Sequence, residues 1–125
     1  MAKKKSRYIV YLSAECKPED VSRKEDKQLR YINDYARARG IHIVEVVRRN
    51  GMSGFEMNKQ FARMTALIER KKADGILITK AAVIAGTIEQ AYMRAGQVAA
   101  VGGRLVTVDE GELSFNLHIN RRSGL

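Results

Sequence analysis

A serine follows the first apolar segment of the sequence, and it is the first residue whose chemistry we consider. Residues Arg7–Leu12 are rich in β-branched and aromatic types and precede a polar run from Ser13 to Pro18. This pattern predicts a buried strand that ends in a surface loop. In an open α/β sheet, ligands bind at the carboxyl ends of the strands. Ser13 could therefore be a nucleophile, although a serine in such a place is more often a loop or helix-capping residue.

A second loop, residues 48–54, is predicted at the same edge of the sheet. It reads Arg48-Arg49-Asn50-Gly51-Met52-Ser53-Gly54 and is dense in turn-forming residues. Its two glycines, with arginines beside them, could approach a phosphate group. A flexible loop without a ligand explains the composition about equally well, so both interpretations stay open.

The sequence gives no support for a metal or a cofactor. Cys16 is the single cysteine, and it is far in sequence from the two histidines, His42 and His118. No strand-to-helix turn carries a dinucleotide-binding or P-loop glycine pattern. His42 and Glu45 are expected to be solvent-facing strand residues rather than a catalytic pair. We therefore expect no metal site and no cofactor, and a lone cysteine suits a reducing cytoplasm.

The charge points to an anionic partner. The formal net charge is +9 over 125 residues, which favours DNA or RNA as a partner, although a basic surface that only confers solubility has the same composition. No apolar run approaches the roughly 18 residues of a membrane span, and the first residues lack the apolar stretch of a signal peptide. We expect no membrane association and a cytoplasmic location.

Helical periodicity separates the predicted strands. Ser22-Arg23-Lys24-Glu25 has the pattern of a capping box, which predicts a helix from near Ser22 to a left-handed cap at Gly40. A second helix is predicted from about Asn58 to Lys72. A third is predicted from a second capping box, Thr87–Gln90, to about Val101.

The remaining strands complete an α/β pattern. Strands are predicted at residues 41–47, 76–79 and 104–108, and the alternation of residues 113–119 predicts a fifth strand after a short turn. Strands that alternate with helices favour one three-layer α/β domain with four mostly parallel strands and an antiparallel fifth. The basic ends, residues 1–6 and 120–125, are expected to be flexible.

The order of these segments resembles the catalytic domain of the resolvase/invertase family of serine recombinases, over nearly the whole chain. In that family the serine that ends the first strand attacks a DNA phosphate, and Ser13 corresponds to it. The segments that resemble family motifs are Ile9–Ser13, Gln28–Ala36 with Gly40, Arg49–Gly54, Asn58–Met64, Lys80–Gly86 and Val106–Gly111.

The sequence departs from the family pattern at most of the charged positions. Ser13 and the loop serine, Ser53, are kept. The family's other charged groups correspond here to Tyr11 (an arginine), Arg49 or Asn50 (an aspartate), Asn58 beside Lys59 (an arginine), and Ala82, Val83 and Gly86 (an aspartate and two arginines).

These departures imply that the strand-cleavage activity of the family has been lost or nearly lost. Attack on a phosphodiester requires a deprotonated nucleophile and donors that stabilise the added negative charge, and clustered guanidinium groups do this best. Losing one such donor commonly lowers the rate on the order of 10²- to 10³-fold. Arg48, Arg49, Lys59 and Lys80 could restore part of the positive potential, which leaves residual activity as an alternative.

The resemblance also implies that the family's C-terminal helix and DNA-binding domain are missing from this sequence. Family members continue past the catalytic domain into a long helix, which forms the dimer and grips DNA, and then into a DNA-binding domain. This sequence ends at Leu125. We therefore expect weak electrostatic binding to DNA, to which Lys3–Lys5 and Arg121-Arg122 could contribute.

Three functions remain open at this point. The first is a catalytically degenerate recombinase-like domain, from a bacterium or mobile element, that binds DNA, itself or a full-length recombinase. The second is an active DNA strand-transfer recombinase that uses Ser13, and the third is a protein-interaction module without nucleic acid. The residues expected to contact nucleic acid are Arg48, Arg49, Ser53, Lys59, Lys80, Arg121 and Arg122.

Overall fold

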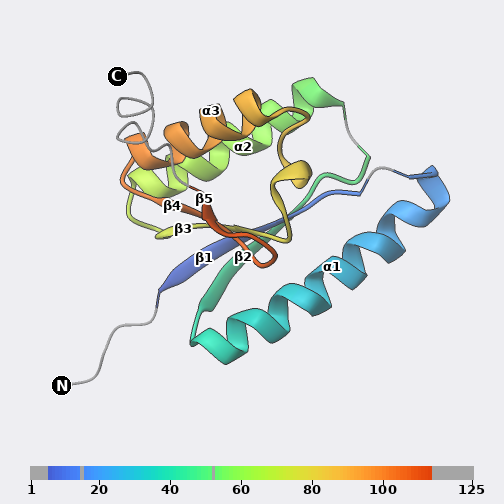
Figure 1. Cartoon of the computed structure of the whole chain (residues 1–125), viewed down its shortest axis with the longest axis horizontal. Coiled ribbons are helices and arrows are strands. Elements are labelled where there is room, and N and C mark those ends of the chain that lie inside the picture. Colours follow the sequence, from blue (N-terminus) through green and yellow to red (C-terminus); the bar gives the residue numbers. More distant parts are fainter. Residues whose placement is uncertain (1–5, 15, 52, 114–125) are drawn as a thin grey trace, which may run out of the picture.

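A five-stranded sheet organises the fold. The computed structural model describes residues 6–14, 16–51 and 53–113, and Figure 1 shows the sheet between its helices. Four strands are parallel: β1 (Arg7–Leu12), β2 (His42–Arg48), β3 (Gly75–Ile78) and β4 (Arg104–Thr107). β5 (Gly111–Leu113) is antiparallel to β4, and the strand order is β2-β1-β3-β4-β5. The predicted α/β class, with an antiparallel fifth strand, is confirmed.

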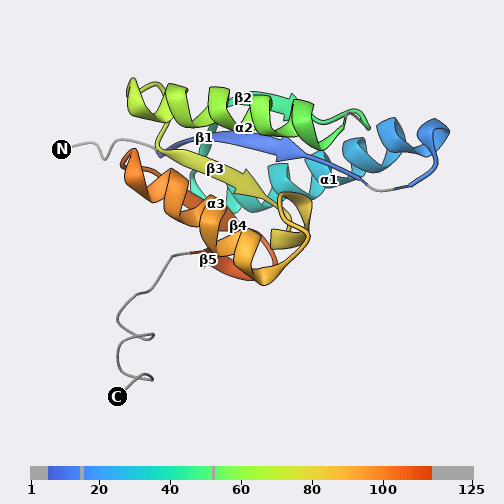
Figure 2. The same cartoon turned by 90° about the horizontal axis from the view of Figure 1, so that it is seen from above.

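Helices cover both faces of this sheet. α1 (Pro18–Arg39) lies on one face, and α2 (Gly54–Glu69) and α3 (Ile88–Ala100) lie on the other (Figure 2). A short 3-10 helix, η1 (Ala81–Val83), follows β3. The molecule therefore has the three predicted layers. Among the described residues, no helix is both long and apolar enough to cross a bilayer.

Alternation along the central strand divides the core into two clusters. Ile9 and Tyr11 pack toward α2 and α3, whereas Tyr8, Val10 and Leu12 pack toward α1. All five are buried, because β1 has a neighbouring strand on each side and helices on both faces. β1 is thus held from all sides, and Ser13 comes directly after it.

The start of α1 differs from the prediction. The helix begins at Pro18, with Lys17 as its N-cap, rather than near Ser22. Proline suits the first helical position, and Glu19 and Asp20 in the first turn interact favourably with the helix dipole. Glu25 therefore lies well inside the helix, and its buried carboxylate accepts a hydrogen bond from the Asn50 backbone N–H instead of capping Ser22.

The other helix boundaries are closer to expectation. α2 begins at Gly54, four residues before the predicted start, because the Ser53 hydroxyl caps it by accepting from the Glu56 N–H. Thr87 caps α3 in the same way, by accepting from the Gln90 N–H, as the second capping box predicted. Gly40 ends α1 in the left-handed conformation, with φ of 68°.

One glycine permits close packing at the amino end of the sheet. A Cβ atom at Gly75 would lie 2.2 Å from the Arg104 carbonyl oxygen and 2.6 Å from the Tyr8 ring. Only glycine fits where β3 lies between β1 and β4 at this point. At the other end of the sequence, β5 begins at Gly111, two residues earlier than predicted. The predictions for residues 1–5 and 114–125, including strand residues 114–119 and most of both basic ends, lie outside the described residues.

Candidate functional site

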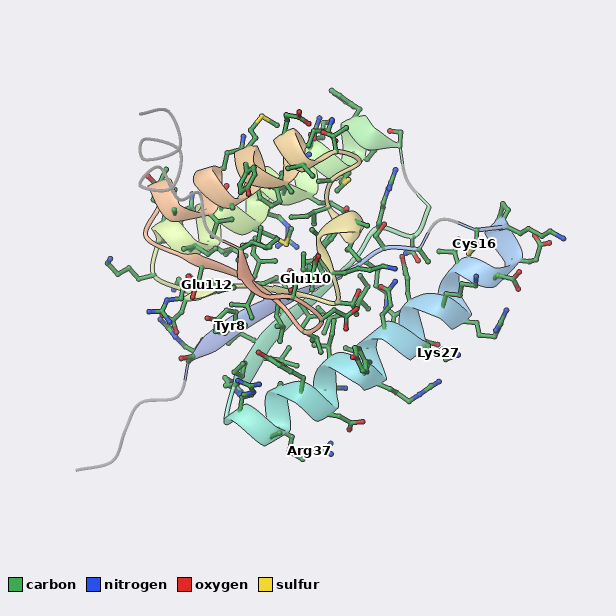
Figure 3. All side chains as sticks on the ribbon, in the orientation of Figure 1. Tyr8, Cys16, Lys27, Arg37, Glu110 and Glu112 are labelled. Atoms are coloured by element: carbon green, nitrogen blue, oxygen red, sulfur yellow. The ribbon has the colours of Figure 1, made fainter. Side chains whose placement is uncertain are left out.

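The carboxyl ends of the four parallel strands meet at one edge of the sheet. Backbone hydrogen bonds join the segments that leave them: the Arg49 N–H donates to the Leu12 carbonyl (2.9 Å), and the Asp109 N–H donates to the Thr79 carbonyl (3.0 Å). The first half of α1 extends along the same edge. Figure 3 shows Cys16 and Lys27 toward this carboxyl edge and Tyr8 and Arg37 toward the opposite one. Residues predicted to act together are thus brought to one side of the molecule.

Ser13 is fixed in place by its main chain. The side-chain amide of Gln28 donates to the Ser13 carbonyl (2.7 Å) and accepts from the Ser13 N–H (3.0 Å). The residue is 6% exposed. Among the described residues, no histidine or carboxylate is hydrogen-bonded to its hydroxyl. The Ser13 main chain is therefore held firmly, and among the described residues no base is in place to deprotonate the hydroxyl.

Three adjoining hollows surround this point. The Ser13 hollow, about 300 Å³, is lined by Ser13, Ala14, Lys24, Gln28, Lys80, Ala82 and Val83. The Arg94 hollow, about 240 Å³, shares Ala82 and Val83 with it and adds chiefly Arg49, Asn58, Gln90 and Arg94. The loop hollow, about 410 Å³, is lined by Ala14, Cys16, Pro18, Val21, Arg49, Asn50 and Gly51.

The lining of these carboxyl-edge hollows is positively charged. Their described lining residues include four basic side chains and no carboxylate: Lys24, Arg49, Lys80 and Arg94. A concave surface of one charge sign concentrates oppositely charged ligands. The arrangement is suited to bind an anion, and arginine and lysine bind phosphate groups as well as carboxylates.

Arg94 is a residue that the sequence analysis missed. Its guanidinium stacks on the Phe61 ring, 4.6 Å from the centroid, and donates to the Asn58 side-chain oxygen. Its Nε is buried and has no hydrogen-bond partner among the described residues. Burial lowers the pKa of Arg94, while nearby Tyr11 opposes this shift, and arginine remains charged at neutral pH. The available signal was that Arg94 is the one basic residue of α3.

Tyr11 is hydrogen-bonded within the protein. Its hydroxyl donates to the Gln60 side-chain oxygen (2.8 Å), and the Gln60 amide in turn donates to the Arg48 carbonyl (2.9 Å). Burial raises the pKa of Tyr11 to about 12, and the neighbouring Arg49 works against this shift. The phenol is therefore neutral at physiological pH and serves to join β1, α2 and the end of β2.

Arg48, predicted to contact nucleic acid, is instead paired within the protein. Its guanidinium lies 3.8 Å from the Glu25 carboxylate and 2.7 Å from the Asp26 carboxylate. The Asn50 N–H donates to Glu25 as well (3.0 Å). These contacts tie the end of β2 to α1, so the first part of loop 48–54 has a structural role.

The other predicted contact residues fall into four groups. Ser53 is exposed and caps α2. Lys59 lies over the Phe55 ring and 3.9 Å from Glu56, outside the three hollows. Lys80 is exposed and lines the Ser13 hollow. Arg121 and Arg122 lie outside the described residues.

In the part of the chain that is described, no three histidine, cysteine or acidic side chains are grouped to hold a metal ion.

Solved structures share this fold at low sequence identity. A resolvase family site-specific recombinase from Streptococcus pneumoniae superposes with a TM-score of 0.76 and 20% identity, over 96% of this chain and 85% of that one. The N-terminal catalytic domain of TP901-1 integrase superposes with a TM-score of 0.72 and 17% identity, over 85% of this chain and 80% of that one. The C-terminal catalytic domain of ISC1926 TnpA, an IS607-like serine recombinase, superposes with a TM-score of 0.65 and 21% identity, over 84% of this chain and 71% of that one.

Sequence comparison identifies the family. The comparison with curated proteins gave no match. The family profile described as "Resolvase, N terminal domain" matches residues 18–121, and this match begins after Ser13. The assignment of Ser13 to the family's nucleophile position thus remains a prediction from the resemblance of Ile9–Ser13. Because the profile covers most of the chain, the protein belongs to the resolvase family of serine recombinases.

Proposed function

We propose that this resolvase-family domain binds the DNA backbone at its carboxyl edge and has lost most strand-cleavage activity. The observation that carries the proposal is the lining of the three hollows, in which Lys24, Arg49, Lys80 and Arg94 occur without a carboxylate among the described residues. Such a surface neutralises phosphates of any sequence, so the binding is electrostatic and not sequence-specific.

The loss of cleavage rests on what surrounds Ser13. The resemblance places family arginines at Tyr11, Asn58 and Val83, and none of these side chains carries a charge here. In addition, the Tyr11 hydroxyl is hydrogen-bonded to the Gln60 side chain. Arg94 supplies a guanidinium from α3, but it stacks on Phe61 and is hydrogen-bonded to Asn58. One donor held in this way cannot replace a cluster that binds the phosphate oxygens bidentately.

Titration of a labelled DNA duplex at two salt concentrations tests the proposal. If four phosphates are neutralised, the affinity should fall on the order of a hundredfold between about 50 mM and about 200 mM salt. Denaturing electrophoresis of the same samples should show no covalent adduct. Salt-insensitive binding, or none, would overturn the DNA assignment.

A matched pair of serine variants tests the claim about chemistry. Ser13→Ala should bind DNA like the wild type, and Ser22→Ala, at an exposed serine of α1, is the control. A covalent adduct that disappears in Ser13→Ala but persists in Ser22→Ala would establish an active recombinase instead.

A second candidate function, assembly with another copy or with a full-length recombinase, is favoured by the outer face of α3. Ile88, Tyr92 and Met93 are 73%, 49% and 53% exposed, and their spacing places them on one side of the helix. Contiguous apolar side chains of this kind commonly mark interfaces. Sedimentation of the wild type and of Ile88→Glu should show an association that the variant weakens, and a wild type that stays monomeric would exclude self-assembly.

A further inference from the structure

A further groove lies between α1 and the ends of β3 and β4, and Lys80 is the predicted contact residue that it includes. It encloses about 470 Å³ and is lined by Arg23, Lys24, Lys27, Gln28, Tyr31, Thr79, Lys80 and Asp109. The α1 residues recur at a helical spacing, so they share one face of that helix. We call this feature the Tyr31 groove. Its volume is in the range of small-molecule binding sites.

The charge of the Tyr31 groove is positive and largely uncompensated. Among the described residues, no carboxylate lies within 4.0 Å of the ammonium groups of Lys24, Lys27 or Lys80. Arg23 is paired with Asp20 at 3.0 Å. Asp109 is the one acidic lining residue, and it accepts a hydrogen bond from Tyr31. Three lysines therefore remain to bind an anion.

Tyr31 presents an aromatic ring to solvent in a fixed orientation. The side chain is 51% exposed, and its hydroxyl donates to the Asp109 carboxylate at 2.9 Å. That hydrogen bond raises the pKa of Tyr31, so the phenol stays neutral. A ring anchored at its polar tip, with lysines around it, has the two features that single-stranded nucleic acid needs, namely an aromatic stacking surface and cations for the backbone.

The Tyr31 groove is continuous with the Ser13 hollow. Lys24, Gln28 and Lys80 line both of them. A DNA strand with one phosphate at the Ser13 hollow would therefore have its next nucleotide within the groove. Bases inside a duplex are stacked on one another and cannot offer a face to Tyr31, so the groove favours an unpaired base.

We propose that the Tyr31 groove binds one unpaired nucleotide of single-stranded DNA, with its base stacked on Tyr31 and its phosphate bound by Lys27 and Lys80. This inference rests on the proposed function for the anchoring phosphate at the carboxyl edge. It adds a preference for unpaired DNA and assigns that preference to Tyr31.

The test compares a labelled single-stranded oligonucleotide with a duplex of the same sequence, by fluorescence anisotropy. Tyr31→Ala should weaken single-strand binding about tenfold, because stacking on one base typically contributes that much or more. Tyr31→Phe keeps the ring and should bind nearly as the wild type. Phe55→Ala is the matched control, since Phe55 is 66% exposed on α2, on the other face of the sheet. Duplex binding should change less than twofold in all three variants.

The lysines are tested through the salt dependence of single-strand binding. Lys27→Gln should lower the slope of log affinity against log salt by about 0.7, the value for one phosphate contact in a single strand. Lys72→Gln, at an exposed lysine that follows α2, should leave the slope unchanged. Thermal unfolding of each variant confirms that the fold is retained.

The possible failures are distinguishable. If Tyr31→Ala binds the single strand as the wild type does while Arg94→Gln weakens the duplex, the groove assignment is overturned and the proposed function stands. If the wild type binds neither the single strand nor the duplex, both proposals are overturned. Equal weakening by Tyr31→Ala and Phe55→Ala would also overturn the inference, because any exposed aromatic ring would then have the same effect on binding.

Discussion

Two groups of arginines at the same edge of the sheet differ in what faces them. At the end of β2, Arg48 lies against Glu25 and Asp26, at 3.8 and 2.7 Å. Around Ser13, Arg49 and Arg94 line hollows that contain no carboxylate among their described lining residues. We call Arg48, Glu25, Asp26 and the Asn50 N–H the β2–α1 cluster. Arg49 and Arg94 lie in the carboxyl-edge hollows.

The difference shows that position at a functional edge does not by itself assign a function to a charge. In the β2–α1 cluster the positive charge is compensated within the protein, so it stabilises the fold and has little left for a ligand. In the carboxyl-edge hollows the described lining residues include no carboxylate, so the basic side chains there are better placed to attract an anionic ligand. The two regions should therefore respond oppositely to mutation, one in stability and the other in binding.

The largest expected effect is the removal of the buried carboxylate in the β2–α1 cluster. Glu25→Ala should lower the free energy of unfolding by about 3 kcal/mol, because it leaves the Asn50 N–H without its acceptor and the partly buried Arg48 with Asp26 as its remaining acidic partner. Urea unfolding measures this change. Glu69→Ala, at the exposed end of α2, is the control and should change stability by less than about 0.5 kcal/mol. Similar losses in both variants would show that Glu25 has no special role.

A pair of arginine variants gives the most direct contrast. Arg94→Gln should weaken duplex DNA binding about tenfold, the cost of about 1.4 kcal/mol that attends a lost charged contact. Arg48→Gln should leave DNA affinity within about twofold while it lowers the unfolding midpoint, since its charge is already compensated. Anisotropy titrations at a temperature where both variants are folded measure the affinities. Arg94→Lys keeps the charge and should retain most of the binding.

The comparison between the regions fails if Arg48→Gln weakens DNA binding as much as Arg94→Gln does. In that case the ion pairs with Glu25 and Asp26 would have to open when DNA binds, and the β2–α1 cluster would belong to the binding surface.

These two arginines also mark how far the sequence could be interpreted. The strand and helix order, the cap at Thr87 and the antiparallel β5 were predictable, because each depends on local spacing or on a short connection. Ser22–Glu25 satisfied the same local pattern as Thr87–Gln90 but misled, because Glu25 bonds across 25 positions to Asn50. A local pattern does not reveal that a carboxylate has a more favourable partner elsewhere in the fold.

The candidate site was predictable in part. Ser13, Arg49 and Lys80 were placed correctly at the carboxyl edge, because parallel strands bring their ends together. Arg94 was missed since it reaches this edge from α3, where it is hydrogen-bonded to Asn58 at a separation of 36 positions. The Tyr31 groove was missed for a related reason: the residues of α1 that line it gain a role only when β3 and β4 end opposite them.

The smallest expected effect concerns Tyr11, which lies between the two regions and is influenced by Arg49 and Glu25 alike. Tyr11→Phe should lower the unfolding free energy by about 1 kcal/mol at neutral pH, through loss of the hydrogen bond to Gln60. Because burial raises the pKa of Tyr11 in the folded state from 10.0 to about 12, the folded protein holds this proton more tightly than the unfolded chain does. Its contribution is therefore complete below pH 10 and is lost as the pH rises toward 12.

The difference between wild type and Tyr11→Phe should accordingly shrink and then reverse over that alkaline range, as measured by urea unfolding at a series of pH values. Tyr35→Phe, which removes a phenol on α1 that has no hydrogen-bond partner among the described residues, is the control and should follow the wild type. A gap for Tyr11→Phe that stays constant with pH would mean that the phenol reaches solvent.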